Sequence, residues 1–239
     1  MTPLELVRQV EGRKLVNEDG EVEHLKLLQP LEAEELATLE TRIPCPLPAE
    51  ARELLMYSRG FENGPVESVN FSGLMDFGME EVFPCPIPIA HDGFGNYWVV
   101  DLTSGSRAWG PILYVCHDPA VIVFQSTSLA EFIEELLKLG NPPYKSALDE
   151  VHETAAFAVW TDLSRMRGAR ELHNAEDAAL REFAAGLDGD WLIADLRNAA
   201  VGDGYPWGRF GPRTVNRRMG EERVFAIQRK SLWKRLIGG

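Results

Sequence analysis

With 239 residues, of which 45% are hydrophobic and 26% charged, the chain has the composition of a folded protein and not that of a disordered one. Its three cysteines are too few and too far apart for a disulfide framework, and no pair has the spacing of a zinc ribbon. The N-terminus lacks the basic and apolar regions of a signal peptide, and no apolar run reaches the ~18 residues of a membrane span, so we expect a cytoplasmic protein.

The net charge of −13 is unevenly distributed along the chain. Residues 1–208 carry a net charge of −20, whereas residues 209–239 contain nine Lys or Arg and two Glu, a net charge of +7. An acidic body repels nucleic acid and attracts a basic protein. The basic end is compatible with nucleic-acid binding, but we favour its packing against the acidic body.

Two elements are predicted before residue 30. Residues 3–10 suit a short helix. Residues 15–28 suit a hairpin, because the turn signal Asn17-Glu18-Asp19-Gly20 separates two short apolar segments. We therefore describe residues 1–29 as an N-terminal extension made of a helix and a hairpin.

A pair of helices is predicted next. In residues 31–40 apolar side chains recur on one face behind an acidic first turn, which complements the helix dipole. Pro48 opens the second helix at a position that proline tolerates. Gly60 and the following Asn63-Gly64 end that helix.

A series of short strands follows the helix pair. Residues 67–71 are strand-like, and the proline-rich segment 83–90 suits an edge strand or a linker, because proline cannot donate to a ladder of hydrogen bonds. The strands with the richest content of aromatic and β-branched residues are predicted at 97–102, 112–117 and 120–125.

A helix at 129–139, capped by Ser126-Thr127-Ser128, closes the central region of residues 30–140. Short strands joined by tight turns and flanked by helices predict an α+β fold with a mainly antiparallel sheet.

The clearest linker signal is Gly140-Asn141-Pro142-Pro143. Beyond it the sequence predicts two helices and two strands, with a loop rich in glycine and aromatic residues before the last strand. The predicted ranges are 147–166 and 170–186 for the helices, 191–195 and 223–227 for the strands, and 202–212 for the loop. Residues 141–239 therefore form a C-terminal α+β extension or a small second domain with a basic end.

The order of several separated segments resembles the SUKH superfamily, the Smi/Knr-type domain. The segments are Pro46-Leu47-Pro48 after the acidic helix, Gly60-Phe61-Glu62-Asn63-Gly64, the strand–turn–strand from Ile87 to Leu102, Gly110 to Asp118, and Ser128-Leu129-Ala130-Glu131-Phe132-Ile133. No single motif is specific, but their order over about 110 residues is. The superfamily includes a fungal regulator of cell-wall synthesis and many bacterial immunity proteins against polymorphic toxins. The resemblance implies an α+β fold, no catalysis and a protein-binding role.

The segment Asp92-Gly93-Phe94-Gly95-Asn96 has three interpretations: a phosphate loop, a calcium loop and a structural turn. A phosphate-binding glycine loop opens a helix, whereas a strand follows here, and a calcium loop needs more carboxylates. We therefore favour a tight turn, in which glycine adopts positive φ and Asp or Asn bonds the local backbone.

The pairs His91-Asp92 and His117-Asp118 raise the alternative of a metal-dependent hydrolase. Such a site needs several ligands that converge on one metal, and the chain has only five histidines, so we expect no metal. Cys116 and His117 are neighbours on a predicted strand and point to opposite faces, which argues against a catalytic dyad.

The segment from Tyr205 to Arg213 interleaves aromatic and cationic residues. This composition is found in single-strand nucleic-acid platforms, in protein interfaces and in loops that pack internally, and we favour internal packing. On the strand at 97–102, Trp98 is expected in the core, and Asp101 either bonds a turn or lies on a binding face.

The resemblance, together with the acidic body, implies a non-enzymatic immunity protein, without a cofactor, whose acidic surface covers a basic toxin such as a nuclease. The alternatives are a cytosolic scaffold or regulatory homodimer formed through residues 141–239, and the metal-dependent hydrolase. Nucleic acid and membrane are not expected as partners. The predicted interface residues are Glu62, Asp92, Asn96, Asp101, His117, Asp118, Trp207 and Arg209.

Overall fold

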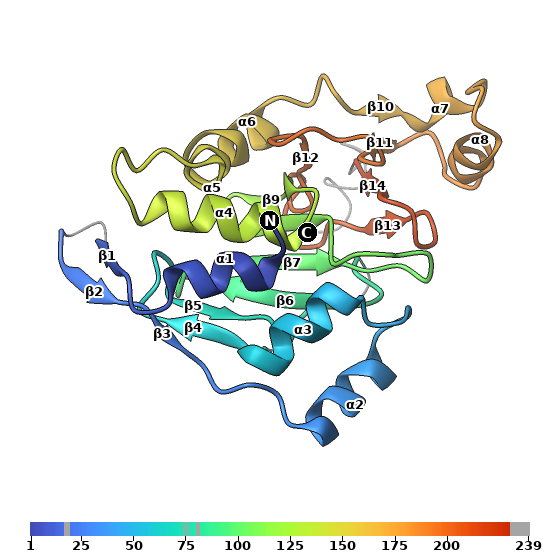
Figure 1. Cartoon of the computed structure of the whole chain (residues 1–239). Helices are drawn as coiled ribbons and strands as arrows, with labels where there is room; N and C mark the ends of the chain where they lie inside the picture. The colour runs from blue at the N-terminus through green and yellow to red at the C-terminus, as the bar shows by residue number, and fades with distance from the viewer. Residues whose placement is uncertain (17–19, 74, 76, 80–81, 230–239) are drawn as a thin grey trace.

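A computed structural model describes residues 1–16, 20–73, 75, 77–79 and 82–229 (Figure 1). The predicted turn at 17–19 and the basic residues Lys230, Lys234 and Arg235 lie outside the described residues. The helical elements are α1 (Pro3–Val10), α2 (Ala33–Arg42), α3 (Ala49–Tyr57), α4 (Leu129–Leu139), α5 (Ala147–Glu150), the π-helix η1 (Val151–Ala155), α6 (Ala156–Thr161), α7 (Ala169–Leu172) and α8 (Ala178–Ala185).

The strands form one large sheet, one smaller sheet and a hairpin. The strands are β1 (Lys14–Val16), β2 (Val22–His24), β3 (Lys26–Leu27), β4 (Gly60–Glu62), β5 (Ser68–Asn70), β6 (Pro86–His91), β7 (Tyr97–Asp101), β8 (Ile112–His117), β9 (Ala120–Ser126), β10 (Arg167–Gly168), β11 (Trp191–Asp195), β12 (Gly204–Tyr205), β13 (Asn216–Arg218) and β14 (Val224–Gln228).

The large sheet has eight strands in the order β12-β9-β8-β7-β6-β5-β4-β3, and every described pairing in it is antiparallel. The small sheet has the order β10-β11-β14-β13, and β1 pairs with β2 as the predicted hairpin. The predicted α+β class with a mainly antiparallel sheet is therefore confirmed.

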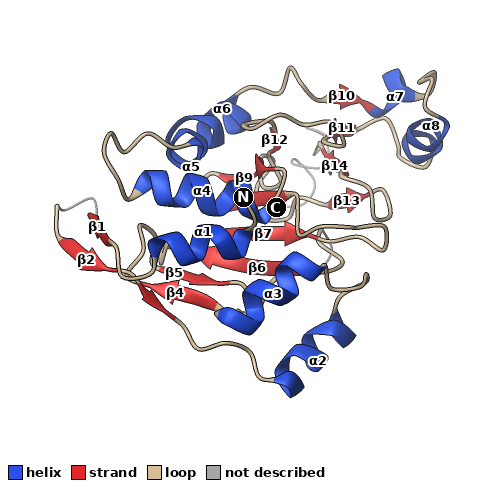
Figure 2. Cartoon of the chain, in the orientation of Figure 1, coloured by secondary structure: helices blue, strands red, loops and turns tan. Residues whose placement is uncertain are grey.

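Both faces of the large sheet are covered, and helices α1, α3 and α4 lie over one of them (Figure 2). Along β8, Tyr114 and Cys116 join the core shared with α1, α3 and α4, whereas Leu113 and Val115 join the core shared with the small sheet. This alternation follows from the two-residue period of a strand. It explains why β7, β8 and β9 are almost continuously apolar, since a sheet that is buried on both faces has no solvent side.

The proline-rich segment is not a linker. It forms β6, which lies between β5 and β7, and only its last two residues pair with β5. Pro86 and Pro88 pair with β7 alone, in a stretch that β5 does not reach. Because proline has no backbone N–H, Pro86 and Pro88 could not donate hydrogen bonds to β5, but no strand residue of β5 lies opposite them. An interior strand therefore tolerates both prolines.

The two helices predicted after residue 146 differ from the observed ones. The first is helical from Ala147 to Thr161, but its middle turn is the π-helix η1. The second is divided into α7 and α8. Asp177 causes this restart, because its carboxylate accepts a hydrogen bond from the Leu180 backbone and so caps α8.

Residues 141–229 contact the central region in three ways. Strand β12 pairs with β9 in the large sheet, and the small sheet packs on the face formed by Val99, Leu113 and Phe124. In addition, the Ser104 backbone and hydroxyl both donate to Glu221. The C-terminal segment is thus part of the same packed structure as the central region.

Candidate functional site

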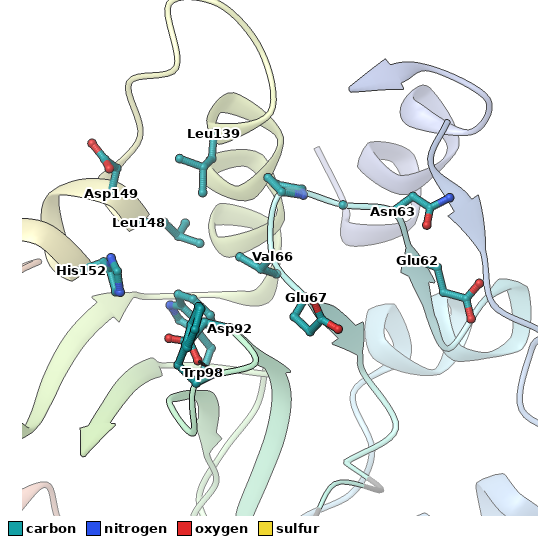
Figure 3. A pocket seen from close by; sticks show the side chains of 13 residues that line it. Glu62, Asn63, Val66, Glu67, Asp92, Trp98, Leu139, Leu148, Asp149 and His152 are labelled. Carbon is teal, nitrogen blue, oxygen red and sulfur yellow. Dashed lines mark hydrogen bonds between the residues drawn. The ribbon is translucent and has the colours of Figure 1, made fainter. Parts of the chain in front are cut away.

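A cleft of about 620 Å³ opens at one end of the large sheet (Figure 3). We call its two sides the strand side and the helix side. The strand side consists of Glu62, Asn63, Gly64, Pro65, Val66, Glu67, Asp92, Phe94 and Trp98. The helix side consists of Leu139, Leu148, Asp149 and His152.

The turn between β6 and β7 forms one part of the strand side. Gly93 and Gly95 have φ values of +80° and +90°, a region that favours glycine. The Asp92 carboxylate accepts hydrogen bonds from the backbone of Phe94, at 2.9 Å, and of Asn96, at 3.2 Å. The predicted tight turn is therefore confirmed, and it holds Phe94 outward with 80% of its surface exposed.

Asn96 joins this turn to the neighbouring strand. Its amide donates to Asp92 at 2.6 Å, and its oxygen accepts from the His117 backbone at 3.0 Å and contacts His117 Nδ1 at 2.9 Å. Asn96 is only 6% exposed. Its side chain therefore fixes the turn and presents no surface to a partner, which corrects the prediction that it belongs to an interface.

The connection from β4 to β5 forms the other part of the strand side. Gly60 has a φ of +153°, and a Cβ atom there would lie 2.0 Å from the Val69 carbonyl oxygen, so only glycine allows this close approach. Glu62 is exposed and its carboxylate lies 3.0 Å from Lys26 Nζ. The side chain of Glu67 packs against the Gly93 turn, where a Cβ atom would meet its Cγ at 3.2 Å.

The helix side is held by Glu135 of α4. Its carboxylate accepts hydrogen bonds from the Ala147 backbone at 2.7 Å and from the Ser146 hydroxyl at 3.1 Å, and it pairs with Lys138. Burial raises the pKa of Glu135, but the hydrogen bonds from Lys138 and the Ala147 backbone outweigh it and hold the pKa below its ordinary value. The next turn is the π-helix that contains His152, and π-helical turns are frequent at functional sites.

The floor of the cleft is aromatic. Trp98 is 3% exposed, as its predicted core position requires, and its ring nitrogen donates to Gln125 at 3.2 Å. Below it, the ring of Tyr114 lies 5.1 Å from Trp98 and 5.7 Å from His152, measured between centroids. Burial raises the pKa of Tyr114 far above its ordinary value, so its hydroxyl stays protonated.

The cleft is strongly acidic. Four carboxylates line it, those of Glu62, Glu67, Asp92 and Asp149, and no Lys or Arg is among the described residues that line it. Figure 3 shows Asp149 and His152 on the helix side, Asp92 and Trp98 near the floor, and Glu62 at the far end. Because concave surfaces of one sign focus their field, this arrangement attracts cations.

Asp101 lies away from the cleft at the other end of β7. It is 1% exposed, and Arg218 donates two hydrogen bonds to its carboxylate at 2.7 and 2.8 Å. Arg218 also donates to the carbonyl oxygens of Val82, Glu221 and Glu222. The expectation that Asp101 lies on a binding face is therefore corrected, because its carboxylate is fully used inside the chain.

Trp207 and Arg209 belong to a loop that packs on the central region. The Trp207 ring nitrogen donates to the Cys116 carbonyl at 3.1 Å, and the Arg209 guanidinium lies 5.0 Å from the Trp160 ring centroid. Both side chains are half-buried. The loop rich in aromatic and cationic residues thus makes internal contacts, as we favoured, and neither Trp207 nor Arg209 lines the cleft, so their place in an interface stays a prediction.

The remaining predicted residues lie near the cleft without lining it. His117 and Asp118 are exposed at the end of β8, and Cys116 is buried, so Cys116 and His117 do point to opposite faces. His91 accepts a hydrogen bond from the Gly93 backbone. Within the described part of the chain, no three His, Cys, Asp or Glu side chains are grouped to hold a metal ion.

Sequence reasoning missed Glu67, Phe94, Asp149 and His152 as members of one site. For Phe94 a signal was present, since a large aromatic residue between two turn glycines has no core to enter. Asp149 and His152 are three residues apart in a predicted helix, and so share one face. No sequence signal indicated that this face meets the β6–β7 turn.

The described part of the chain thus combines an α+β fold with an acidic cleft. The sequence model of the SMI1 / KNR4 family (SUKH-1) matches residues 30–135. These residues therefore form a SUKH domain, which confirms the resemblance seen in the sequence.

Searches of curated proteins and of solved structures found no match to the chain. Among the described residues, no helix is both long enough and apolar enough to cross a membrane.

Proposed function

We propose that this protein is a non-enzymatic immunity protein that binds a basic toxin in the cytoplasm and covers it. The observation that carries the proposal is the cleft, in which four carboxylates surround a space of about 620 Å³ without a lining Lys or Arg among the described residues. The SUKH domain supports it, because the superfamily includes toxin-immunity proteins.

The mechanism follows from charge and shape. The net charge of −13 steers a basic partner toward the protein, and the cleft then receives a basic segment of that partner. Phe94 supplies an exposed aromatic anchor at the rim, a residue type that contributes much of the affinity of protein interfaces. Inhibition is steric, since a covered active site admits no substrate.

The test uses the product of a toxin-like gene adjacent to the gene for this protein. The two purified proteins should form a complex in light scattering, and the toxin should lose activity. The variant Glu67→Lys should weaken the complex at least tenfold, because it reverses a cleft charge while keeping the aliphatic stem that packs on the Gly93 turn.

The matched control is Glu176→Lys, which makes the same change of charge at an exposed position that does not line the cleft. Its effect should stay within twofold. If neither a complex nor protection from the toxin is seen, the immunity function is wrong for that pair. If both variants weaken binding equally, the cleft is not the binding site.

A further inference from the structure

The cleft extends past the end of the family match. The match ends at residue 135, whereas Leu139, Leu148, Asp149 and His152 all follow it. The SUKH domain thus supplies the strand side, and the segment after it supplies the whole helix side. Two proteins that share the strand side can therefore differ in what they bind.

The helix side is fixed in place before any partner arrives. Glu135 of α4 holds the first turn of α5 through Ser146 and Ala147. Leu148 and Val151 are each 1% exposed and anchor the helix in the core below. Side chains on a rigid element hold their geometry well enough to discriminate between ligands.

The polar groups on this side are available to a ligand. The Asp149 carboxylate is exposed and has no hydrogen bond or ion pair among the described residues. Within the same residues, the His152 ring makes one polar contact, from its Nδ1 to the Glu153 carboxylate at 3.0 Å. Glu153 is itself exposed. Two carboxylates and an imidazole therefore face solvent around one turn of helix.

A second observation comes from beneath the floor. The Tyr114 hydroxyl is fully buried, and apart from the weakly bonding thiol of Cys116 it has no hydrogen-bond partner among the described residues. Its ring contacts both Trp98 and His152, which line the cleft. A buried hydroxyl without a good partner is uncommon, and here its ring packs directly beneath two residues that line the cleft.

We propose that the helix side determines specificity, and that Asp149 and His152 receive a guanidinium or ammonium group from a basic loop of the partner protein. Asp149 provides the opposite charge, and the Phe94 ring across the cleft provides an aromatic face for the same cation. This inference rests on the proposed function, since it names the group that the cleft takes from the toxin.

The test needs no knowledge of the natural partner. The probe is a fluorescent hexa-arginine peptide, and its neutral counterpart is the same peptide with citrulline at every position. Both are titrated against the full chain at physiological salt, where weak diffuse attraction between exposed charges is screened. The arginine peptide should bind, with amide shifts in nuclear magnetic resonance that centre on Phe94 and His152, and the citrulline peptide should not.

Two matched pairs of variants locate the contact. Asp149→Lys and Glu176→Lys make equal changes of charge, as do the milder Asp149→Asn and Glu176→Gln. Asp149→Lys should weaken peptide binding about tenfold, and Asp149→Asn should weaken it about threefold. The Glu176 variants should stay within twofold. Unchanged thermal unfolding of Asp149→Asn excludes a loss of folding as the cause.

The outcomes separate this inference from the proposed function. If Glu67→Lys weakens binding but the Asp149 variants behave like their Glu176 controls, the cleft binds the cation through its strand side and the inference is wrong. If Glu67, Asp149 and Glu176 variants all behave alike, binding is diffuse and the cleft proposal fails with it.

Discussion

The two ends of strand β7 carry carboxylates in opposite situations. At its C-terminal end, Asp101 is buried and paired with Arg218, which lies 117 residues further along the chain. Near its other end, in the turn that leads into β7, Asp92 lines a cleft whose acids Glu67 and Asp149 have no ion pair among the described residues. A buried carboxylate needs a counter-charge within the fold, and removal of that counter-charge is costly, whereas unpaired carboxylates in a concave surface remain available to a partner.

The largest expected effect tests the buried end. Arg218→Met should lower the free energy of unfolding by about 3–5 kcal/mol, because it leaves the Asp101 carboxylate buried without a counter-charge. Urea unfolding measures it. Asp101→Leu combined with Arg218→Met should recover much of the loss, and Arg213→Met, at an exposed arginine, should have almost no effect. A small effect of Arg218→Met would show that the pair is not structural.

A smaller loss of stability is expected from a change in the turn between β6 and β7. Asn96→Ala should cost about 2 kcal/mol, because the His117 backbone loses its bond to Asn96 and Asp92 loses the amide. His117→Ala removes only one side-chain contact at an exposed position and should cost less than half as much. Equal losses in thermal unfolding would contradict the bridging role of Asn96.

The helix side should respond to acid. Because the pKa of Glu135 is lowered in the folded protein, its contribution to stability is complete above the ordinary glutamate pKa of about 4.3 and disappears as the pH falls through the lowered value. Glu135→Gln should therefore be less stable than the native protein by about 1 kcal/mol at pH 7, and the difference should vanish in acid. Urea unfolding at a series of pH values checks this. A difference that persists in acid would show that the charge of Glu135 is not the cause.

The smallest effect concerns the exposed pair at the cleft rim. Lys26→Ala should change stability by no more than about 0.5 kcal/mol, because both partners of the Lys26–Glu62 pair are largely exposed. It should nevertheless raise the affinity for the arginine peptide, since it frees the Glu62 carboxylate. Titration of the peptide against this variant would distinguish a cleft that is sensitive to charge from one that is not.

The sequence predicts the local features of this molecule well. Strands β7, β8 and β9 are dense in β-branched and aromatic residues, and the turn before β7 has glycines where positive φ is required. These signals are encoded within a few residues, so they can be recognised without the fold. The helix capped by Ser128 belongs to the same category, since its hydroxyl accepts from Glu131.

The features that were missed depend on distant parts of the chain. The burial of Asp101 depends on Arg218, and the tolerance for Pro86 and Pro88 depends on how far β5 extends. The cleft itself requires that α5 meets the β6–β7 turn. Neither composition nor periodicity indicates which distant segments of the chain come into contact.

The pairing of β12 with β9 has a consequence for any attempt to isolate the SUKH domain. The segment around β12 covers the outer edge of β9 through Gly202, Asp203 and Gly208, which bond to Phe124 and Ala120. An uncovered edge strand as apolar as β9 is a template on which other chains add and aggregate. A fragment that ends at residue 140 would expose that edge together with one apolar face of the sheet, so we expect it to precipitate. We therefore expect the segment after the SUKH domain to protect the protein from self-association.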